Sequence, residues 1–284
     1  MTPPISIVDA HVHFWNPQQL NYPWLASMPP LNRAFLPDDY AAAARAANVG
    51  KIIFVEGGSE AAQNRDEVKW ISQLAAQETR LKGIVAHAPL ELGACMRGEL
   101  AALSSNALVK GVRRNLQGEA DINFCLQLDF LAGVRALAEF GFSFDLCVTH
   151  QQLPAVLELV RRCPEVFFIL DHCGKPAIRD RQLDPWRRHI RELAALPNVA
   201  CKISGLVTEA NPARCGAEDL QPYVEHALAC FGFDRVMFGG DWPVCNCAKP
   251  FSTWLGLLKE ILANETEANL TGLFQTNAER IYHV

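Results

Sequence analysis

The chain has 284 residues, half of them hydrophobic and a fifth of them charged. This balance is typical of a globular protein with an ample apolar core, and it excludes a disordered chain. The formal net charge of −5 gives no electrostatic reason to expect nucleic acid or an anionic membrane surface as a partner. Because α/β barrels of about 250 residues commonly form one domain, we expect a single domain over residues 1–284.

The sequence was searched for signals of secretion and of membrane insertion. Residues 1–9 contain no basic stretch followed by an apolar one, and no run of about 18 apolar residues occurs in the chain. Neither a secretory signal nor a membrane span is therefore expected. The ten cysteines form no CxxC pair and several lie in apolar runs, so they are predicted to be buried free thiols of a cytoplasmic protein.

Short runs rich in β-branched and aromatic residues alternate with longer segments of helical periodicity. Strands are predicted near residues 5–13, 51–57, 82–88, 108–114, 142–148, 166–171, 198–204 and 235–240. Helices are predicted over residues 38–47, 63–79, 128–140, 153–162, 185–196, 219–231 and 254–263. Alternating strands and helices indicate a parallel sheet. Eight such units without a GxGxxG turn after the first strand favour a closed (β/α)8 TIM barrel over an open Rossmann-type sheet.

One connection is too long for a minimal loop between a strand and a helix. The segment from Trp15 to Pro37 is rich in Pro, Trp, Tyr and Asn. Long loops of this kind cover substrates in many enzymes. An ordered surface insertion without a ligand role is an equally good interpretation.

Polar residues at the carboxyl ends of barrel strands are the candidates for chemistry, because barrel active sites lie at that end. His11 and His13 are two residues apart on the first strand, so their side chains point the same way with Cα atoms roughly 6.5 Å apart. His172 and Asp241 follow the sixth and eighth strands. Three imidazoles and one carboxylate suit one zinc ion with an open position for water. The histidine pair alone could equally be two hydrogen-bonded structural residues.

At these residues the sequence resembles a known family. The run Val8-Asp9-Ala10-His11-Val12-His13-Phe14-Trp15, with Tyr22-Pro23-Trp24, is similar to the start of the sugar-lactonase branch of the amidohydrolase superfamily. Later segments agree in order: Lys110-Gly111-Val112-Arg113, Leu170-Asp171-His172-Cys173-Gly174-Lys175-Pro176, Cys201-Lys202-Ile203-Ser204-Gly205-Leu206 and Phe238-Gly239-Gly240-Asp241-Trp242-Pro243. The resemblance implies a hydrolase of aldonolactones, with dicarboxylate lactones as related substrates.

The sequence departs from the superfamily pattern at the fifth strand, where metal-dependent members usually carry a histidine. His150 lies beyond that strand, so Asp145 or Cys147 is expected at the inward position. The fourth strand offers only Arg113 and Arg114, and no lysine or glutamate that could bridge two metals. One zinc ion or none therefore fits the sequence, and a binuclear site does not.

For lactone opening, Asp241 is predicted to accept a proton from the attacking water and to return one to the leaving ring oxygen. Two other roles for Asp241 are a metal ligand and a helix N-cap before Trp242. His172, with His11 and His13, would polarise the lactone carbonyl, either directly or through the metal. All four side chains are thus both catalytic candidates and metal-ligand candidates.

Six further residues are predicted to bind the substrate: Glu56, His87, Arg113, Lys202, Trp24 and Trp242. Arg113 could instead form a buried ion pair with Asp145 or Glu56. Lys202 could instead extend from the barrel interior towards water, and His87 is better interpreted as a structural histidine. The two tryptophans would wall a sugar pocket, although aromatic side chains more often belong to the core. Arg114 is expected to face the helices.

Three alternatives to a sugar lactonase stay open. A hydrolase of dicarboxylate lactones would use the same groups. A metal-dependent decarboxylase would need a ligand on the fifth strand, which the sequence lacks. A barrel that binds a sugar acid without catalysis is the alternative outside enzymes, since a fold does not guarantee an activity. The expected partner is a small-molecule lactone.

Overall fold

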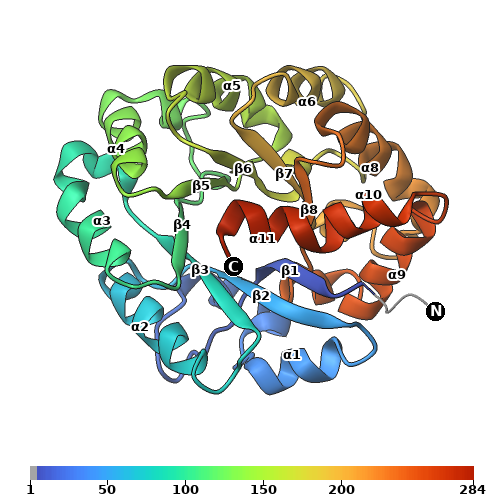
Figure 1. Ribbon diagram of the computed structural model, residues 1–284, viewed down its shortest axis with the longest axis horizontal. Helices are drawn as coiled ribbons and strands as arrows, with labels where there is room; N and C mark the ends of the chain where they lie inside the picture. The colour runs from blue at the N-terminus through green and yellow to red at the C-terminus, as the bar shows by residue number, and fades with distance from the viewer. Residues whose placement is uncertain (1–4) are drawn as a thin grey trace.

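In the computed structural model, which describes residues 5–284, eight parallel strands lie side by side in the order of the chain. The strands are β1 (Ile7–Val12), β2 (Val49–Val55), β3 (Leu81–His87), β4 (Val109–Arg113), β5 (Ser143–Leu146), β6 (Phe168–Leu170), β7 (Val199–Ile203) and β8 (Val236–Phe238). Beyond β8, the backbone N–H of Asp241 donates to the carbonyl of His11 and that of His13 donates to the carbonyl of Trp242, both at 2.8 Å. These bonds join the last strand to the first and bring the sheet close to a closed barrel (Figure 1).

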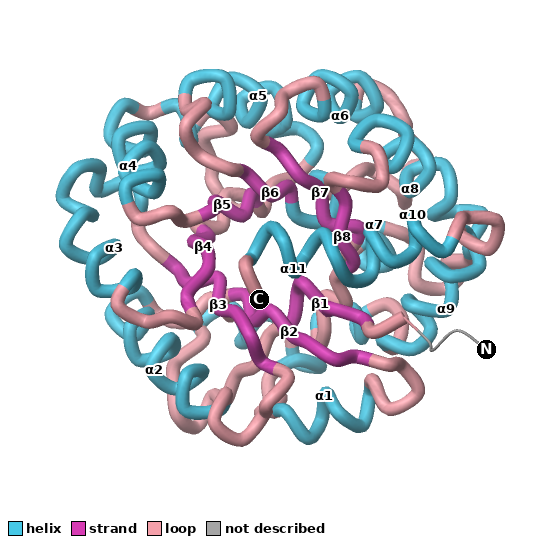
Figure 2. Tube along the Cα trace, in the orientation of Figure 1, coloured by secondary structure: helices cyan, strands magenta, loops and turns pink. Residues whose placement is uncertain are grey.

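Helices surround the sheet as an outer ring (Figure 2). They are α1 (Pro37–Ala43), α2 (Asn64–Leu74), α3 (Arg97–Ser104), α4 (Leu128–Glu139), α5 (Leu153–Arg162), α6 (Trp186–Ala194), α8 (Ala217–Phe231) and α9 (Phe251–Ile261), with the short α7 (Leu206–Glu209) and α10 (Glu267–Thr271). Helix α5 illustrates why these segments are helical. Its buried Leu153, Val156, Leu157 and Val160 recur at the helical repeat and form one apolar stripe. Arg161 and Arg162 lie in its last turn, where the helix dipole favours positive charge.

The predicted fold class is confirmed: an amidohydrolase-type (β/α)8 barrel. All eight predicted strands are present, although β6 and β8 are only three residues long. The predicted bounds of α5 match those observed. Helices α3, α7, α10 and the final helix α11 (Asn277–Tyr282) were not predicted. Short helices carry few turns of periodic sequence, so their pattern is weak.

Helix α11 closes the amino-terminal end of the barrel, where Figure 1 shows it across the opening. Its Ala278 and Tyr282 pack with interior residues of the strands. Near the start of β2, the ammonium of Lys51 lies 2.7 Å from the carboxylate of Glu279 on this helix. The opposite, carboxyl-terminal end of the barrel, called the mouth below, is therefore the end available for a substrate.

The segment from Trp15 to Pro37 is an ordered insertion built on two short 3-10 turns, Pro23–Ser27 and Pro29–Leu31. The indole N–H of Trp15 is shared between the carbonyls of Leu31 (3.1 Å) and Arg33 (2.9 Å). The segment is therefore held by its own buried core. Its predicted role in covering a substrate stays a prediction.

All ten cysteines are unpaired. Cys95 and Cys247 are exposed and Cys230 is partly buried, which corrects the expectation of burial at these three positions, because all three lie outside the strands. Within residues 5–284, no helix combines the length and the apolar character needed to cross a membrane.

Candidate active site

Four side chains from three strand ends meet at the mouth of the barrel. The Nε2 atoms of His11, His13 and His172 lie 3.8, 3.6 and 3.9 Å from Oδ1 of Asp241. All four residues are buried. The four residues predicted to form the reaction centre are thus brought together around one carboxylate oxygen.

The buried carboxylate of Asp9, on β1, connects the segment that carries His11 to the segment that carries Asp241. Asp9 accepts hydrogen bonds from the backbone N–H of His11 (3.2 Å) and of Gly240 (2.7 Å), and from the Tyr40 hydroxyl (2.8 Å). Burial raises the pKa of Asp9 to about 7, although these hydrogen bonds oppose the rise. Asp9 therefore links β1 to the segment that carries Asp241.

Each histidine has a partner on its other ring nitrogen. Nδ1 of His13 lies 2.8 Å from the carbonyl of Val55, and Nδ1 of His172 lies 2.8 Å from the hydroxyl of Ser204. A carbonyl only accepts, so His13 carries its proton on Nδ1 and turns the lone pair of Nε2 towards Asp241. Nδ1 of His11 lies 3.3 Å from Oδ1 of Asp171. These contacts fix the orientation of all three rings.

The backbone at the mouth adopts unusual conformations. His172, Cys173 and Lys175 have φ values of 54°, 51° and 46°, and Asp241 has a φ of 53°. Left-handed backbone costs about 1–3 kcal/mol for residues other than glycine and tends to occur at functional sites. Hydrogen bonds hold this turn: the indole of Trp186 donates to the carbonyl of Cys173 at 2.8 Å, and the N–H of Lys175 donates to the carbonyl of His172 at 2.9 Å.

A network of buried charges lies beneath the histidines. The Lys202 ammonium is 2.5 Å from Asp145 and 3.0 Å from Asp171, and it has no exposed surface. Its Nζ also lies 3.3 Å from Nδ1 of His11, so Lys202 contacts the cluster of candidate catalytic residues from the barrel interior. The predicted extension towards water is wrong, because the side chain is fully buried between two carboxylates. A substrate-binding role for Lys202 stays a prediction. The Tyr282 hydroxyl of α11 donates to Asp145 at 2.7 Å. Asp145 is thus the inward residue of the fifth strand.

Arg113 forms the buried ion pair that was the alternative to a free substrate-binding role. Its Nε lies 2.7 Å from Oε1 of Glu56, and its Nη1 lies 3.6 Å from Asp171. Glu56 is itself buried. Arg114 has the opposite orientation, as expected, and pairs with Glu91 and Glu119.

Pairing sets the charge state of these groups. Burial acts to raise the pKa of Asp171, but the neighbouring Lys202 and His11 hold it well below its usual range. Burial acts in the same sense on Asp241, and its three imidazole neighbours, His172 foremost, lower its pKa overall. Burial lowers the pKa of His172 to about 4. At neutral pH Asp171 and Asp241 are therefore ionised, and His172 is neutral.

The two tryptophans predicted to wall a sugar pocket, Trp24 and Trp242, differ in burial. Trp242 is only 1% exposed and packs against Phe14, Phe35 and Tyr40, with ring centroids 5.3–6.0 Å apart. It is therefore a core residue, which corrects the prediction that it contacts a sugar. Trp24 is half-buried, and its indole donates to the carbonyl of Gly57 at 2.8 Å.

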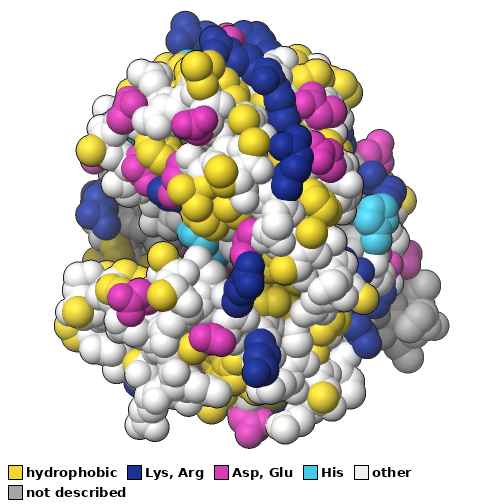
Figure 3. All heavy atoms as spheres, turned by 90° about the vertical axis from the view of Figure 1, so that its left-hand side faces the viewer, with side chains coloured by type: hydrophobic (Ala, Val, Ile, Leu, Met, Phe, Trp, Pro, Cys, Tyr) yellow, Lys and Arg dark blue, Asp and Glu magenta, His cyan; other side chains and the backbone are white. Residues whose placement is uncertain are grey.

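His87 is half-buried and lines a cavity of about 450 Å³ between the connections that follow β2 and β3. Figure 3 shows the side of the molecule that is on the left in Figure 1, where acidic and basic side chains are interspersed among hydrophobic and uncharged ones. His87 is thus accessible, and a substrate-binding role for it stays a prediction.

Several residues of the site were not singled out from the sequence: Asp9, Asp171, Ser204 and Tyr282. Asp171 directly precedes His172 after β6, and Asp9 lies two residues before His11 within β1; this proximity to candidate histidines was the available signal. Ser204 shares a strand-end motif with Lys202. No local signal marks Tyr282, because its partner Asp145 is distant in the sequence.

The residues present fit one metal ion. One nitrogen or oxygen atom from each of His11, His172 and Asp241 lies within 4.8 Å of the others, and all three residues are buried. Two imidazoles and a carboxylate are a donor set that suits a borderline metal such as zinc. His150 is held elsewhere, with Nδ1 3.1 Å from the carbonyl of Lys175. Asp241 does not cap a helix, because Pro243 occupies that position in the turn that follows.

The barrel and its mouth define a hydrolase of the amidohydrolase superfamily. The family model described as "Amidohydrolase" matches residues 8–284, and the chain belongs to this family. It is 36% identical to an L-fucono-1,5-lactonase of Burkholderia multivorans, over 97% of this chain and 95% of that protein. It is 29% identical to an L-fucono-1,5-lactonase of Burkholderia ambifaria, over 87% of this chain and 83% of that protein.

A solved structure is also similar over nearly the whole chain. It is an amidohydrolase of Burkholderia multivorans crystallised with bound zinc, with a TM-score of 0.88 and 35% sequence identity. The match covers 98% of this chain and 99% of that one.

Proposed function

We propose that this hydrolase opens the ring of a sugar-acid lactone to give the free acid. The observation that carries the proposal is the convergence of three imidazole Nε2 atoms on Oδ1 of Asp241, at 3.6–3.9 Å. The names of the two Burkholderia relatives, both L-fucono-1,5-lactonases, support a lactone as the substrate.

Asp241 is the group that moves the proton. Its lowered pKa keeps it ionised at neutral pH, so Oδ1 can accept a proton from a water as that water attacks the lactone carbonyl carbon. When the tetrahedral intermediate collapses, the bond from this carbon to the ring oxygen breaks. The same carboxyl group then gives its proton to that oxygen, so a hydroxyl and a carboxylic acid are formed.

His172 stabilises the charge that develops on the carbonyl oxygen, because its Nδ1 can accept from the Ser204 hydroxyl and its Nε2–H can then donate to that oxygen. His11, His13 and His172 are held in fixed orientations by Asp171, Val55 and Ser204, and a preorganised site does not reorganise during the reaction. His11, His172 and Asp241 would hold a divalent ion such as zinc, which would supply Lewis-acid chemistry at this site.

The test is turnover of a panel of five- and six-membered aldonolactones, followed by acid release with a pH indicator. Wild type should open at least one of them, and Asp241→Asn should lose about 100- to 10,000-fold in rate. Asp234→Asn, at an exposed aspartate close in sequence, is the matched control and should retain full activity. No turnover of any lactone by wild type, or full turnover by Asp241→Asn, would overturn the proposal.

Metal dependence is measured in the same assay. If an ion takes part, treatment with a chelator lowers the rate and addition of zinc restores it. A rate that does not change after the removal of all divalent ions, verified by elemental analysis, would restrict the chemistry to the side chains of the chain.

A further inference from the structure

The left-handed turn that presents His172 also presents a lysine for which the mechanism has no role. His172, Cys173, Gly174 and Lys175 have consecutive φ values of 54°, 51°, 69° and 46°. The hydrogen bond from the N–H of Lys175 to the carbonyl of His172 closes the turn at 2.9 Å. Left-handed backbone is costly at the three residues of this turn other than Gly174, and the turn places Lys175 beside His172 of the proposed reaction centre.

The ammonium of Lys175 connects to the reaction centre through a short chain of contacts. It lies 2.5 Å from Oε1 of Gln117, and that oxygen lies 3.8 Å from the Cys147 thiol. The Cys147 sulfur is in turn within 4.8 Å of a ring nitrogen of His172. On its other side, the Lys175 ammonium is 4.0 Å from a carboxylate oxygen of Glu209 in α7.

The hydrogen-bonding capacity of this group is only partly used. A lysine ammonium has three protons, and the described contacts place one of them on Gln117. The side chain of Lys175 is 18% exposed and that of Glu209 is 26% exposed, so both reach the solvent at the mouth. A donor and an acceptor stand side by side here, next to the reacting groups.

We propose that Lys175 and Glu209, with Gln117 holding the ammonium in place, form a subsite for hydroxyl groups of the substrate that lie away from the lactone carbonyl. This subsite rests on the proposed lactonase function and deepens it. A hydroxyl donates one hydrogen bond and accepts others, so Glu209 can accept from it while Lys175 donates to it or to its neighbour. The subsite would favour polyhydroxylated lactones over lactones without hydroxyls.

Charge favours a neutral polyol over a carboxylate as the bound group. Lys175 and Glu209 carry opposite charges, and the other two cations near the histidines are already paired: Arg113 with Glu56, and Lys202 with Asp145. The carboxylate of Asp241 is a further negative charge whose field reaches Lys175. A second carboxylate on the substrate would find no unpaired cation among these groups.

The experiment compares two substrates in two variants. We measure kcat/KM for a polyhydroxylated six-membered aldonolactone and for δ-valerolactone, which has the same ring and no hydroxyls. Lys175→Met should lower kcat/KM for the aldonolactone by roughly 10- to 100-fold, because hydrogen bonds to a charged group are lost. It should change kcat/KM for δ-valerolactone less than about threefold. Glu209→Gln should act in the same direction with a smaller effect.

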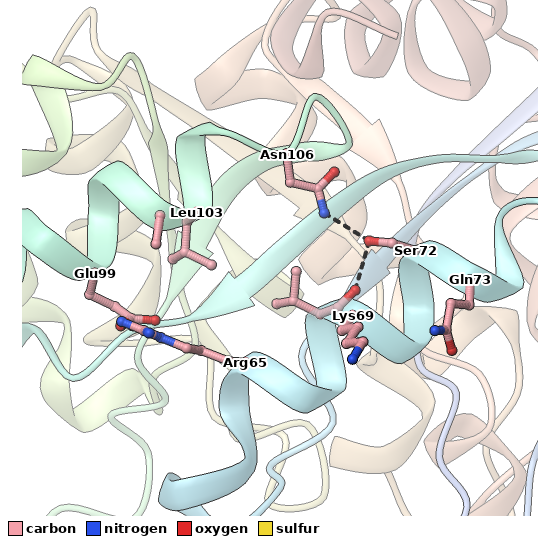
Figure 4. Close-up of a pocket in the computed structure, with 9 residues that line it drawn as sticks. Arg65, Lys69, Ser72, Gln73, Glu99, Leu103 and Asn106 are labelled. Carbon is pink, nitrogen blue, oxygen red and sulfur yellow. Dashed lines mark hydrogen bonds and ion pairs between the residues drawn. The ribbon is translucent and has the colours of Figure 1, made fainter.

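Lys69→Met is the matched control. Lys69 belongs to α2 and lies in a separate groove between α2 and α3, shown in Figure 4, where Asn106 donates to the hydroxyl of Ser72 at 2.8 Å. This variant removes a lysine of the same length far from the proposed subsite. It should leave kcat/KM unchanged for both lactones.

The possible results distinguish a failure of the proposed subsite from a failure of the proposed lactonase function. Equal losses on both lactones would show that Lys175→Met disturbs the His172 turn, and no loss on either would show that Lys175 is not used; each result overturns the subsite. A specific loss on a lactone that carries a carboxylate would replace the neutral polyol with an anion and also overturn it. Should wild type open no lactone, the proposed function fails, and calorimetric binding of the aldonolactone to wild type and to Lys175→Met then decides the subsite.

Discussion

Oδ1 of Asp171 lies 3.3 Å from Nδ1 of His11, and both side chains are fully buried. The same nitrogen lies 3.3 Å from the Lys202 ammonium, and Nε2 of His11 lies 3.4 Å from Nη1 of Arg113. Asp171 is thus one of the charged neighbours that orient the ring. Such partners commonly contribute 10- to 100-fold to metal affinity or activity in metal sites. The same carboxylate lies 3.0 Å from the Lys202 ammonium, so it also balances a buried charge.

Asp171→Asn is therefore expected to lower the rate of lactone opening by roughly 10- to 100-fold. It should also destabilise the fold by about 3 kcal/mol, since one member of a buried ion pair is lost. Steady-state rates and urea unfolding of the purified variant measure the two effects. A variant with the wild-type rate would show that the contact with Asp171 does not orient His11.

Gly205→Ala tests how closely the His172 ring must be placed. A Cβ at Gly205 would lie 2.5 Å from Nδ1 of His172, so the ring has to move. Displacements of about 1 Å in an active site can cost about 100-fold in rate, and we expect a loss of that order in kcat.

Gly141→Ala is the matched control for this variant. Gly141 also has a positive φ, of 69°, but a Cβ there meets no atom within 4 Å. It carries the backbone strain, about 1–2 kcal/mol, without the contact to a histidine. Similar kinetic losses in the two variants would attribute the effect to strain and not to displacement of His172.

The contact between Tyr282 and Asp145 predicts that helix α11 stabilises the interior of the barrel. Tyr282→Phe removes the hydroxyl that donates to the buried carboxylate at 2.7 Å. We expect a loss of about 1.5–3 kcal/mol in the free energy of unfolding, because a hydrogen bond to a charged group is lost. Urea titrations of Tyr282→Phe and Tyr223→Phe make the comparison.

Tyr223 is the appropriate control because its hydroxyl makes a longer bond, 3.3 Å to the carbonyl of Gln182, in a partly buried position. Its loss should cost no more than about 1 kcal/mol. If the two variants lost the same stability, the bond to Asp145 would have no special weight.

Glu67 on α2 predicts a pH dependence of stability. Burial, reinforced by the charge of Glu56, raises the pKa of Glu67 from 4.5 to about 8. The folded chain therefore holds a proton that the unfolded chain releases between these values. The stability contribution is complete below about pH 4.5 and is lost as the pH rises towards 8, with a slope of at most about 1.4 kcal/mol per pH unit.

Glu67→Gln should remove this slope, so the variant gains stability relative to wild type as the pH rises from 5 to 8. Urea unfolding at several pH values measures the difference. Glu60→Gln, at an exposed glutamate, should follow the wild-type curve. Parallel curves for wild type and Glu67→Gln would mean that Glu67 does not hold a proton in the folded chain.

Local sequence patterns carried most of the information about the barrel. Each strand is a short apolar run, and apolar runs are recognised without any knowledge of distant residues. The spacing of His11 and His13 placed both side chains on one face of β1. Helix α11 lacked such a signal, because its buried face is defined by the strands that it covers, among them β2 through Lys51 and Glu279.

Partners distant in the sequence explain the errors. Trp242 lies just after the last strand, a position typical of pocket residues in barrels. The rings of Phe14, Phe35 and Tyr40 pack against it instead. The alternative in which Lys202 extends towards water fails because two carboxylates from other strands hold its ammonium in the interior. In both cases the missing information was which side chains from other elements lie within a few ångströms.

The sequence by itself determined the barrel and the four residues proposed as its reaction centre, since hydrophobic periodicity and the position of polar residues at strand ends are local properties. Only the tertiary structure decided which of the other charged residues are free. Burial makes an unpaired charge costly, so Arg113 and Lys202 are paired wherever the fold brings carboxylates to them. Lys175, at the same mouth, retains hydrogen-bonding capacity because its turn holds it at the solvent boundary.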